Sequence, residues 1–98
     1  MIRHITLLRF RDGFPVEERE RWLRGLDALA DEIPVILGLT HGPDAGLAAG
    51  QRSADYAIVA EFATAADVAA YYMHPAHDRL KDISVPNADL MVTVDLID

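Results

Sequence analysis

The chain has 98 residues, of which 51% are apolar, and it carries a formal net charge of −7 with no cysteine. This length predicts a single domain over residues 1–98, and the apolar content excludes a disordered chain. The acidic balance and the single lysine argue against a nucleic-acid partner, because phosphate binding needs a basic patch. The lack of cysteine excludes a disulfide, a thiolate zinc site and a cysteine nucleophile.

The amino-terminal segment and the longest apolar runs bear on location. No apolar run approaches the ~20 residues that a membrane-spanning helix needs. The first four residues lead directly into an alternating segment, which is unlike a secretory signal peptide. We therefore expect a cytoplasmic protein without a membrane partner.

The first third of the chain predicts a strand followed by a helix. Residues 2–10 are rich in β-branched and apolar side chains, which is typical of a strand, and Asp12-Gly13 ends it. Pro15 suits the first position of a helix. The apolar residues of this helix recur at spacings of three and four, which defines one face: Trp22, Leu23, Leu26, Leu29, Ala30 and Ile33. Pro34 disfavours helical geometry in the residue before it and so ends the helix.

Three further apolar runs predict strands at residues 35–41, 56–62 and 90–96. A turn at residues 42–44 follows the first of them. A glycine-containing and alanine-containing stretch at residues 45–55 then predicts a loop.

The second helix is expected between the last two strands. Thr64 and Asp67 form a Thr-x-x-Asp capping box at the start of an alanine-rich segment. Pro75 interrupts this helix and, because proline is preorganised for a first helical position, opens a short turn over residues 76–81. Pro86 marks a further break before the last strand.

The order strand, helix, strand, strand, helix, strand predicts an α+β, ferredoxin-like βαββαβ fold: one antiparallel four-stranded sheet with two helices on one face. The first strand is apolar on both sides, with Ile5 and Leu7 opposite Leu8 and Phe10. Two helices cover only one face, and a large bare apolar patch is rare on a monomer. We therefore predict a homodimer through the other sheet face, which closes into a dimeric α+β barrel.

Three segments resemble the stress-responsive A/B barrel (Dabb) domain family: IRHITLLRFRDG, YYMHPAHDRL and MVTVDL. The resemblance covers nearly the whole chain, and its strongest marker is the His-Pro-x-His tetrad at residues 74–77. It implies a dimeric α+β barrel. The plant olivetolic acid cyclase has a similar tetrad and closes a linear polyketide by aldol chemistry without a cofactor. In this resemblance, its strand-one histidine falls on His4, the second tetrad histidine on His77 and its tyrosine on Tyr71.

The same residues suit proton transfer at neutral pH. In the first turn after Pro75, the positive end of the helix dipole would keep the His77 imidazole neutral, the form that accepts a proton. Tyr71 can donate a hydrogen bond to a carbonyl oxygen as it becomes an enolate, and His4 can orient the substrate or return the proton. We predict that this cofactor-independent cyclase-type or isomerase-type chemistry, or simple binding, acts on a carbonyl-containing, polyketide-like ligand. The family's aromatic pocket residues are not preserved at Trp22 and Leu26, so the same substrate is not implied.

Other interpretations give the histidines no catalytic role. In a non-catalytic dimeric module, His4 would be a hydrogen-bonded interior residue, His74 would cap the turn after it and His41 would be a plain loop residue. An open pocket of ~300 Å³ or more at the predicted site would favour ligand chemistry instead.

A metal site is a weaker alternative. His4, His74 and His77 can supply imidazoles, and Asp78 can add a carboxylate. The proline inside the tetrad removes the one-face spacing of a good metal-binding pair, so we expect neither a metal nor another cofactor.

Overall fold

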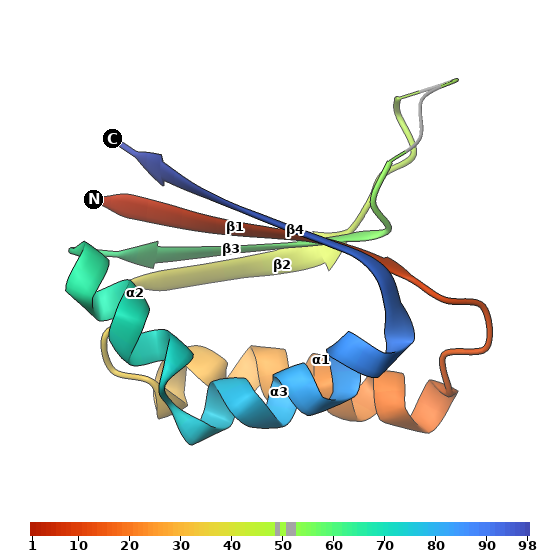
Figure 1. Cartoon of the computed structure of the whole chain (residues 1–98), viewed down its shortest axis with the longest axis horizontal. Coiled ribbons are helices and arrows are strands. Elements are labelled where there is room, and N and C mark those ends of the chain that lie inside the picture. Colours follow the sequence, from red (N-terminus) through yellow and green to blue (C-terminus); the bar gives the residue numbers. More distant parts are fainter. Residues whose placement is uncertain (49, 51–52) are drawn as a thin grey trace.

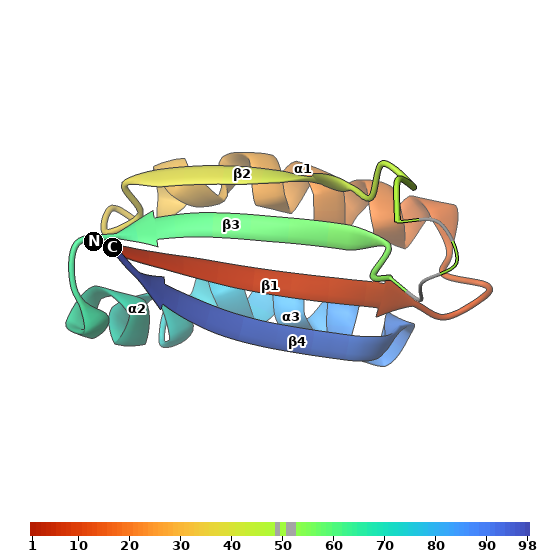
Figure 2. The same cartoon turned by 90° about the horizontal axis from the view of Figure 1, so that it is seen from above.

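The computed structural model describes residues 1–48, 50 and 53–98. Along the chain it contains β1 (Ile2–Phe10), α1 (Val16–Glu32), β2 (Gly38–Pro43), β3 (Tyr56–Phe62), α2 (Ala65–Tyr72), α3 (Pro75–Asn87) and β4 (Ala88–Ile97). The strands form one antiparallel sheet in the order β2-β3-β1-β4. All three helices lie on one side of it, as Figures 1 and 2 show. The predicted ferredoxin-like fold is confirmed.

The core lies between the sheet and the predicted apolar face of α1. Trp22, Leu26 and Leu29 of that helix are at most 2% exposed. They pack in one cluster with the helix-facing side chains of β1 and β3, among them Leu8 and Phe62. Because successive strand residues alternate between faces, this arrangement also places His4 on the helix side of β1.

The second predicted strand is displaced by a few residues. β2 begins at Gly38, whereas the sequence predicts a strand from residue 35. The backbone N–H of Ile36 instead donates to Ile33 in a turn after α1, and Ile36 is buried in the core. The apolar residues directly after Pro34 therefore anchor a turn, and only the residues from Gly38 onward pair with β3. An apolar run by itself does not distinguish a buried turn from a strand.

The region after Pro75 is more regular than predicted. The short turn and the break at Pro86 are wrong, because α3 runs without interruption over 13 residues. Leu80 and Ser84 share a buried face that holds this helix against the core. Pro86 falls in the last turn of α3, and the side chain of Asn87 donates to the backbone carbonyl of Ile83 over 2.7 Å.

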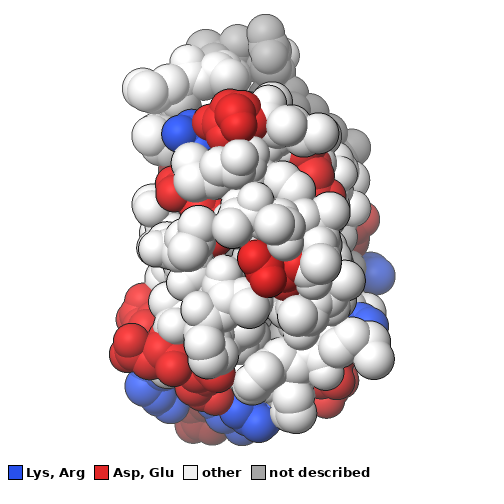
Figure 3. Space-filling model, turned by 90° about the vertical axis from the view of Figure 1, so that its left-hand side faces the viewer, with Lys and Arg blue, Asp and Glu red and all other residues white. Residues whose placement is uncertain are grey.

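One face of the sheet carries no helix (Figure 2). Its apolar side chains come from β1 and β4, and Val92, Val94 and Leu96 are each at least 45% exposed. Charged side chains of both signs gather instead over the helix layer, at the foot of Figure 3. The molecule thus has a charged helix layer and an apolar bare sheet face, defined here by Ile5, Leu7, Val92, Val94 and Leu96. Among the described residues, no helix has both the length and the apolarity to cross a membrane.

The loop before β3 is partly described. Residues 44–48, 50 and 53–55 contain neither helix nor strand. Residues 49, 51 and 52 of the predicted loop lie outside the described part of the chain.

Candidate functional site

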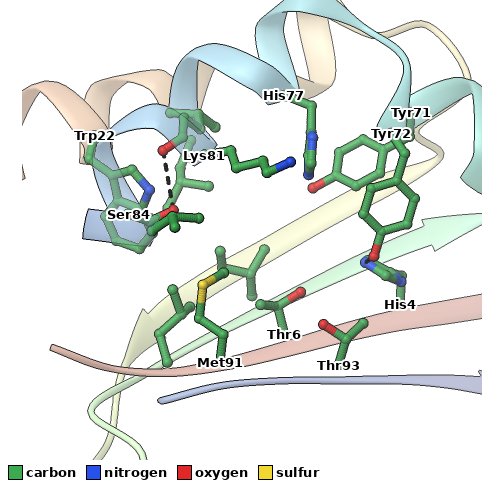
Figure 4. A pocket seen from close by; sticks show the side chains of 15 residues that line it. His4, Thr6, Trp22, Tyr71, Tyr72, His77, Lys81, Ser84, Met91 and Thr93 are labelled. Carbon is green, nitrogen blue, oxygen red and sulfur yellow. Dashed lines mark hydrogen bonds between the residues drawn. The ribbon is translucent and has the colours of Figure 1, made fainter. Parts of the chain in front are cut away.

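A cavity of about 180 Å³ lies between the sheet and the helices α2 and α3. Figure 4 shows two histidines and two tyrosines at one end of it, with Trp22 and Met91 toward the other end. The volume is below the ~300 Å³ at which ordinary ligand pockets begin. The size expected for ligand chemistry is therefore not reached, and the cavity has room only for a small, partly apolar molecule.

The structure brings the three predicted site residues together. The ring centroids of His77 and Tyr71 are 4.6 Å apart, and those of His4 and Tyr71 are 5.8 Å apart. All three line the cavity, although β1 and α3 supply residues that are remote in sequence. Their spatial convergence is thus observed, while their chemical roles stay a prediction.

His4 is held on both sides by hydrogen bonds. Its side chain is 3% exposed, its Nδ1 lies 2.6 Å from Oδ1 of Asp95, and its Nε2 lies 2.9 Å from the hydroxyl of Tyr72. An ionised carboxylate only accepts, so Nδ1–H donates to Asp95, and Nε2 is hydrogen-bonded to the Tyr72 hydroxyl. Since both nitrogens are used, His4 acts on a ligand only through Tyr72.

The two adjacent tyrosines both stay protonated at neutral pH. Burial raises the pKa of Tyr71 to about 12, and the neighbouring Tyr72 adds to this effect. Burial also raises the pKa of Tyr72, the Asp95 carboxylate raises it further, and a hydrogen bond from Thr93 opposes both. Tyr71 is therefore suited to donate a hydrogen bond to an oxygen in the cavity, whereas the hydroxyl of Tyr72 is already hydrogen-bonded to Nε2 of His4.

His77 sits in the first turn of α3, as the proline predicts. His74 is the N-cap residue, and its Nδ1 accepts the backbone N–H of Ala76 over 3.0 Å, so its predicted capping role is confirmed. Pro75 fills the first helical position. This start of the helix directs the His77 ring toward Tyr71 and the cavity (Figure 4).

The environment of His77 favours the neutral imidazole. Burial lowers the pKa of His77, Asp78 opposes this shift, and the positive charges of Lys81 and His4 lower the pKa further. Its Nδ1 is buried and has no hydrogen-bond partner among the described residues. The imidazolium would place an N–H at that atom without an acceptor, which adds a second reason for the neutral form.

Sequence reasoning missed Tyr72, Asp95 and Lys81 as parts of the site. Tyr72 rather than Tyr71 is hydrogen-bonded to His4, because consecutive helical residues point about 100° apart. Asp95 lies directly opposite His4 in the pairing of β1 with β4. An acidic residue in an otherwise apolar last strand was the available signal for Asp95, and the lone lysine of the chain was the signal for Lys81.

The expectation that His41 is a plain loop residue is wrong. His41 belongs to β2, its Nε2 lies 2.7 Å from Asp27 of α1, and its Nδ1 lies 2.6 Å from the hydroxyl of Tyr56. The Gly-Pro sequence after it suggested a turn, but β2 continues to Pro43. His41 therefore ties α1 to the sheet.

The metal alternative gains no support from the arrangement. Within residues 1–48, 50 and 53–98, no three His, Cys, Asp or Glu side chains are placed to hold an ion. His74 uses its Nδ1 to cap α3, and His4 is occupied by Asp95 and Tyr72. These two histidines therefore take part in hydrogen bonds within the protein.

Residues 2–98 match the model of the stress-responsive A/B barrel domain family. The chain belongs to this family. The resemblance noted from the three sequence segments is therefore confirmed over almost the entire length. A comparison with curated proteins gives no match.

Several solved structures share the fold, and some of them are dimeric. A dimeric ferredoxin-like protein of unknown function from Thermobifida fusca YX is 33% identical, with 99% of this chain and 90% of that chain covered and a TM-score of 0.85. A second such dimeric protein, from Jannaschia sp. CCS1, is 25% identical, with 99% and 98% covered and a TM-score of 0.86. A hydroxynitrile lyase from Passiflora edulis is 19% identical, with 99% and 92% covered and a TM-score of 0.85, a likeness in fold alone.

Proposed function

We propose that this A/B barrel protein is a small cofactor-independent enzyme that moves a proton at a carbon next to a carbonyl group. The observation that carries the proposal is the neutral His77 imidazole, which lines the cavity beside two protonated phenols. A neutral imidazole accepts a proton near pH 7, and a phenol stabilises the oxyanion that results. Isomerisation and intramolecular aldol closure are the reactions that this set supports best.

Each residue has a distinct task in this proposal. His77 takes the proton as the C–H bond breaks, and the electron pair moves through the carbon–carbon bond onto the carbonyl oxygen. Tyr71 donates a hydrogen bond to that oxygen. His4 and Asp95 hold the Tyr72 hydroxyl in place and are positioning residues. The enolate then takes the proton back from His77 at another carbon, or its carbon attacks a second carbonyl of the same molecule, whose oxygen takes the proton from His77.

The cavity limits the size of the substrate. At about 180 Å³ it accommodates a compact dicarbonyl compound, or one end of a longer polyketide-like chain. The Passiflora edulis lyase shares the fold, so the scaffold is compatible with catalysis. Polyketide-like substrates are supported by the family resemblance, and the reaction type is supported by the side chains.

Heptane-2,6-dione is a suitable probe, because deprotonation beside one carbonyl allows ring closure onto the other with loss of water. Proton exchange and cyclisation are followed by NMR in D₂O for the wild type, His77→Gln and His74→Asn. The control keeps a side chain able to cap α3 and alters a histidine three residues away. Loss of a general base lowers the rate by ~10²-fold or more, so His77→Gln should lose activity while His74→Asn keeps it. Equal rates in the wild type and His77→Gln would contradict the assignment.

A non-catalytic module with structural histidines is the second candidate. It is favoured by His4, which is almost fully buried and hydrogen-bonded at both ring nitrogens. In that case His4→Phe lowers stability by ~1–3 kcal/mol, as expected for lost buried contacts, and the wild type has no activity with carbonyl compounds.

We further propose that two copies pair through the bare sheet face. Supporting observations are the exposed apolar side chains of β1 and β4 and the dimeric state of the relatives. Val94 is 56% exposed on this face, and a glutamate there would bury a charge in the interface. Val94→Glu should therefore sediment as a monomer at micromolar concentration. Met73→Glu, at a site 82% exposed on the helix side, should remain dimeric; a monomeric wild type would contradict this interface.

A further inference from the structure

The cavity differs in charge from the rest of the protein. The chain has 16 acidic and 9 basic residues, yet neither an aspartate nor a glutamate is among the described side chains that line the cavity. Its one permanently charged lining residue is Lys81, the single lysine of the sequence. Asp95 and Asp78 lie behind the lining, where they act on Tyr72 and His77, so Lys81 is the permanent charge that borders the cavity itself.

Lys81 is placed to meet a ligand at the reactive end of the cavity. It follows His77 by one helical turn on α3, so both side chains lie on the same face. Figure 4 shows its ammonium group directed toward His77 and Tyr71. Within the described part of the chain, Lys81 forms no ion pair, whereas Arg9 and Arg79 each do.

The other side chains that line the cavity indicate which chemical groups the rest of the ligand carries. Trp22, Leu26 and Met91 form an apolar end beyond Lys81. The other polar groups near the reactive end include the Tyr71 hydroxyl, which is a donor, and the Tyr72 hydroxyl, which is bonded to His4. The Nδ1 atom of His77 is buried and has no hydrogen-bond partner among the described residues, so no protein group satisfies this polar atom.

We propose that the ligand of this cavity is a small carboxylic acid whose anionic group pairs with Lys81 and whose alkyl part occupies the apolar end. This inference rests on the proposed function, because it names the substrate class of the same site: a short oxo acid with its carbonyl beside His77. Lys81 thereby selects the ligand and fixes its direction in the cavity.

Hexanoate and hexanamide are matched probes, because they have the same length and differ in charge. Binding to each is measured by NMR titration at about 0.15 M salt, where the Debye length of ~8 Å screens the distant negative charges of the chain. The variants are Lys81→Met, Lys81→Arg and, as a control, Arg24→Met, which removes an exposed cation that does not line the cavity. Lys81 is exposed, and an exposed ion pair predicts that the wild type prefers hexanoate by roughly two- to fivefold.

Lys81→Met should abolish this preference and leave hexanamide binding unchanged, whereas Lys81→Arg and Arg24→Met should retain most of it. Equal binding of both probes to the wild type, or a preference that survives in Lys81→Met, would overturn the inference and leave the proposed proton chemistry standing. Failure of both probes to shift the signals of the cavity residues would overturn the inference together with the ligand site on which it rests.

Discussion

Replacing Asp95 by alanine tests whether this carboxylate holds His4 in place. The His4 side chain is 3% exposed and its Nδ1 lies 2.6 Å from Asp95, so the variant leaves a buried N–H without an acceptor. Hydrogen bonds to charged groups contribute ~1.5–3 kcal/mol. Because 49% of the Asp95 side chain is exposed, solvent screens part of this interaction. We therefore expect Asp95→Ala to lower the free energy of unfolding by about 2 kcal/mol.

Asp89→Ala is the matched control on the same strand. The Asp89 side chain is 40% exposed and pairs with Arg9 over 2.8 Å, and Arg9 is itself 20% exposed. Exposed ion pairs contribute only ~0.2–1 kcal/mol, so this variant should cost less than Asp95→Ala. Both are compared by urea denaturation at pH 7 and equal protein concentration, because association adds to apparent stability. A loss for Asp95→Ala no larger than that for Asp89→Ala would refute the reasoning about His4.

Three further predictions address other parts of the molecule. The pKa of His77 in the folded protein is lowered from 6.5, so the unfolded chain binds the proton first as the pH falls. The free energy of unfolding should therefore decline below pH 6.5, by at most ~1.4 kcal/mol per pH unit. His77→Gln should flatten this decline in urea titrations. Gly25→Ala would place a methyl group against Cδ2 of the buried Leu80, so it should destabilise by about 1 kcal/mol despite the better helix propensity of alanine. A variant more stable than the wild type in urea would contradict this packing. His41→Phe removes the hydrogen bonds to Asp27 and to the buried Tyr56, so it should lower the free energy of unfolding by ~1–3 kcal/mol in thermal unfolding. A loss near zero would contradict the stabilising role given to His41 between α1 and the sheet.

The elements with a clear local signal could be predicted from the sequence. The spacing of Trp22, Leu26 and Leu29 fixes the buried face of α1, and the alternation at residues 56–62 matches β3 at both ends. Thr64 caps α2 by accepting the N–H of Asp67, as its capping box predicts. In these places propensity, periodicity and capping all favour the same structure.

The errors arose where long-range packing overrides a local signal. Ile36 belongs to a β-branched run that predicts a strand, but its burial in the core is satisfied by a turn. Pro86 predicts a break, but the buried face of α3 holds the helix until the turn that contains it. Both outcomes depend on contacts between distant segments, which the local sequence does not encode.

Part of the candidate site could likewise be predicted from the sequence, and part of it depends on the fold. His4, Tyr71 and His77 could be predicted because their residue types and the His-Pro-x-His tetrad point to proton chemistry. The partnership of His4 with Asp95 depends on strand register, since the two residues are 91 positions apart. The choice of Tyr72 over Tyr71 as the partner of His4 depends on how α2 is rotated against the sheet. Neither quantity is available before the fold is known.

A crystal structure of the protein soaked with heptane-2,6-dione tests the central claim most directly. We predict density for the diketone inside the cavity, with one carbonyl oxygen within hydrogen-bond distance of the Tyr71 hydroxyl and an adjacent carbon next to the His77 ring. A cavity closed by these side chains, or a diketone bound only elsewhere on the molecule, would contradict the account.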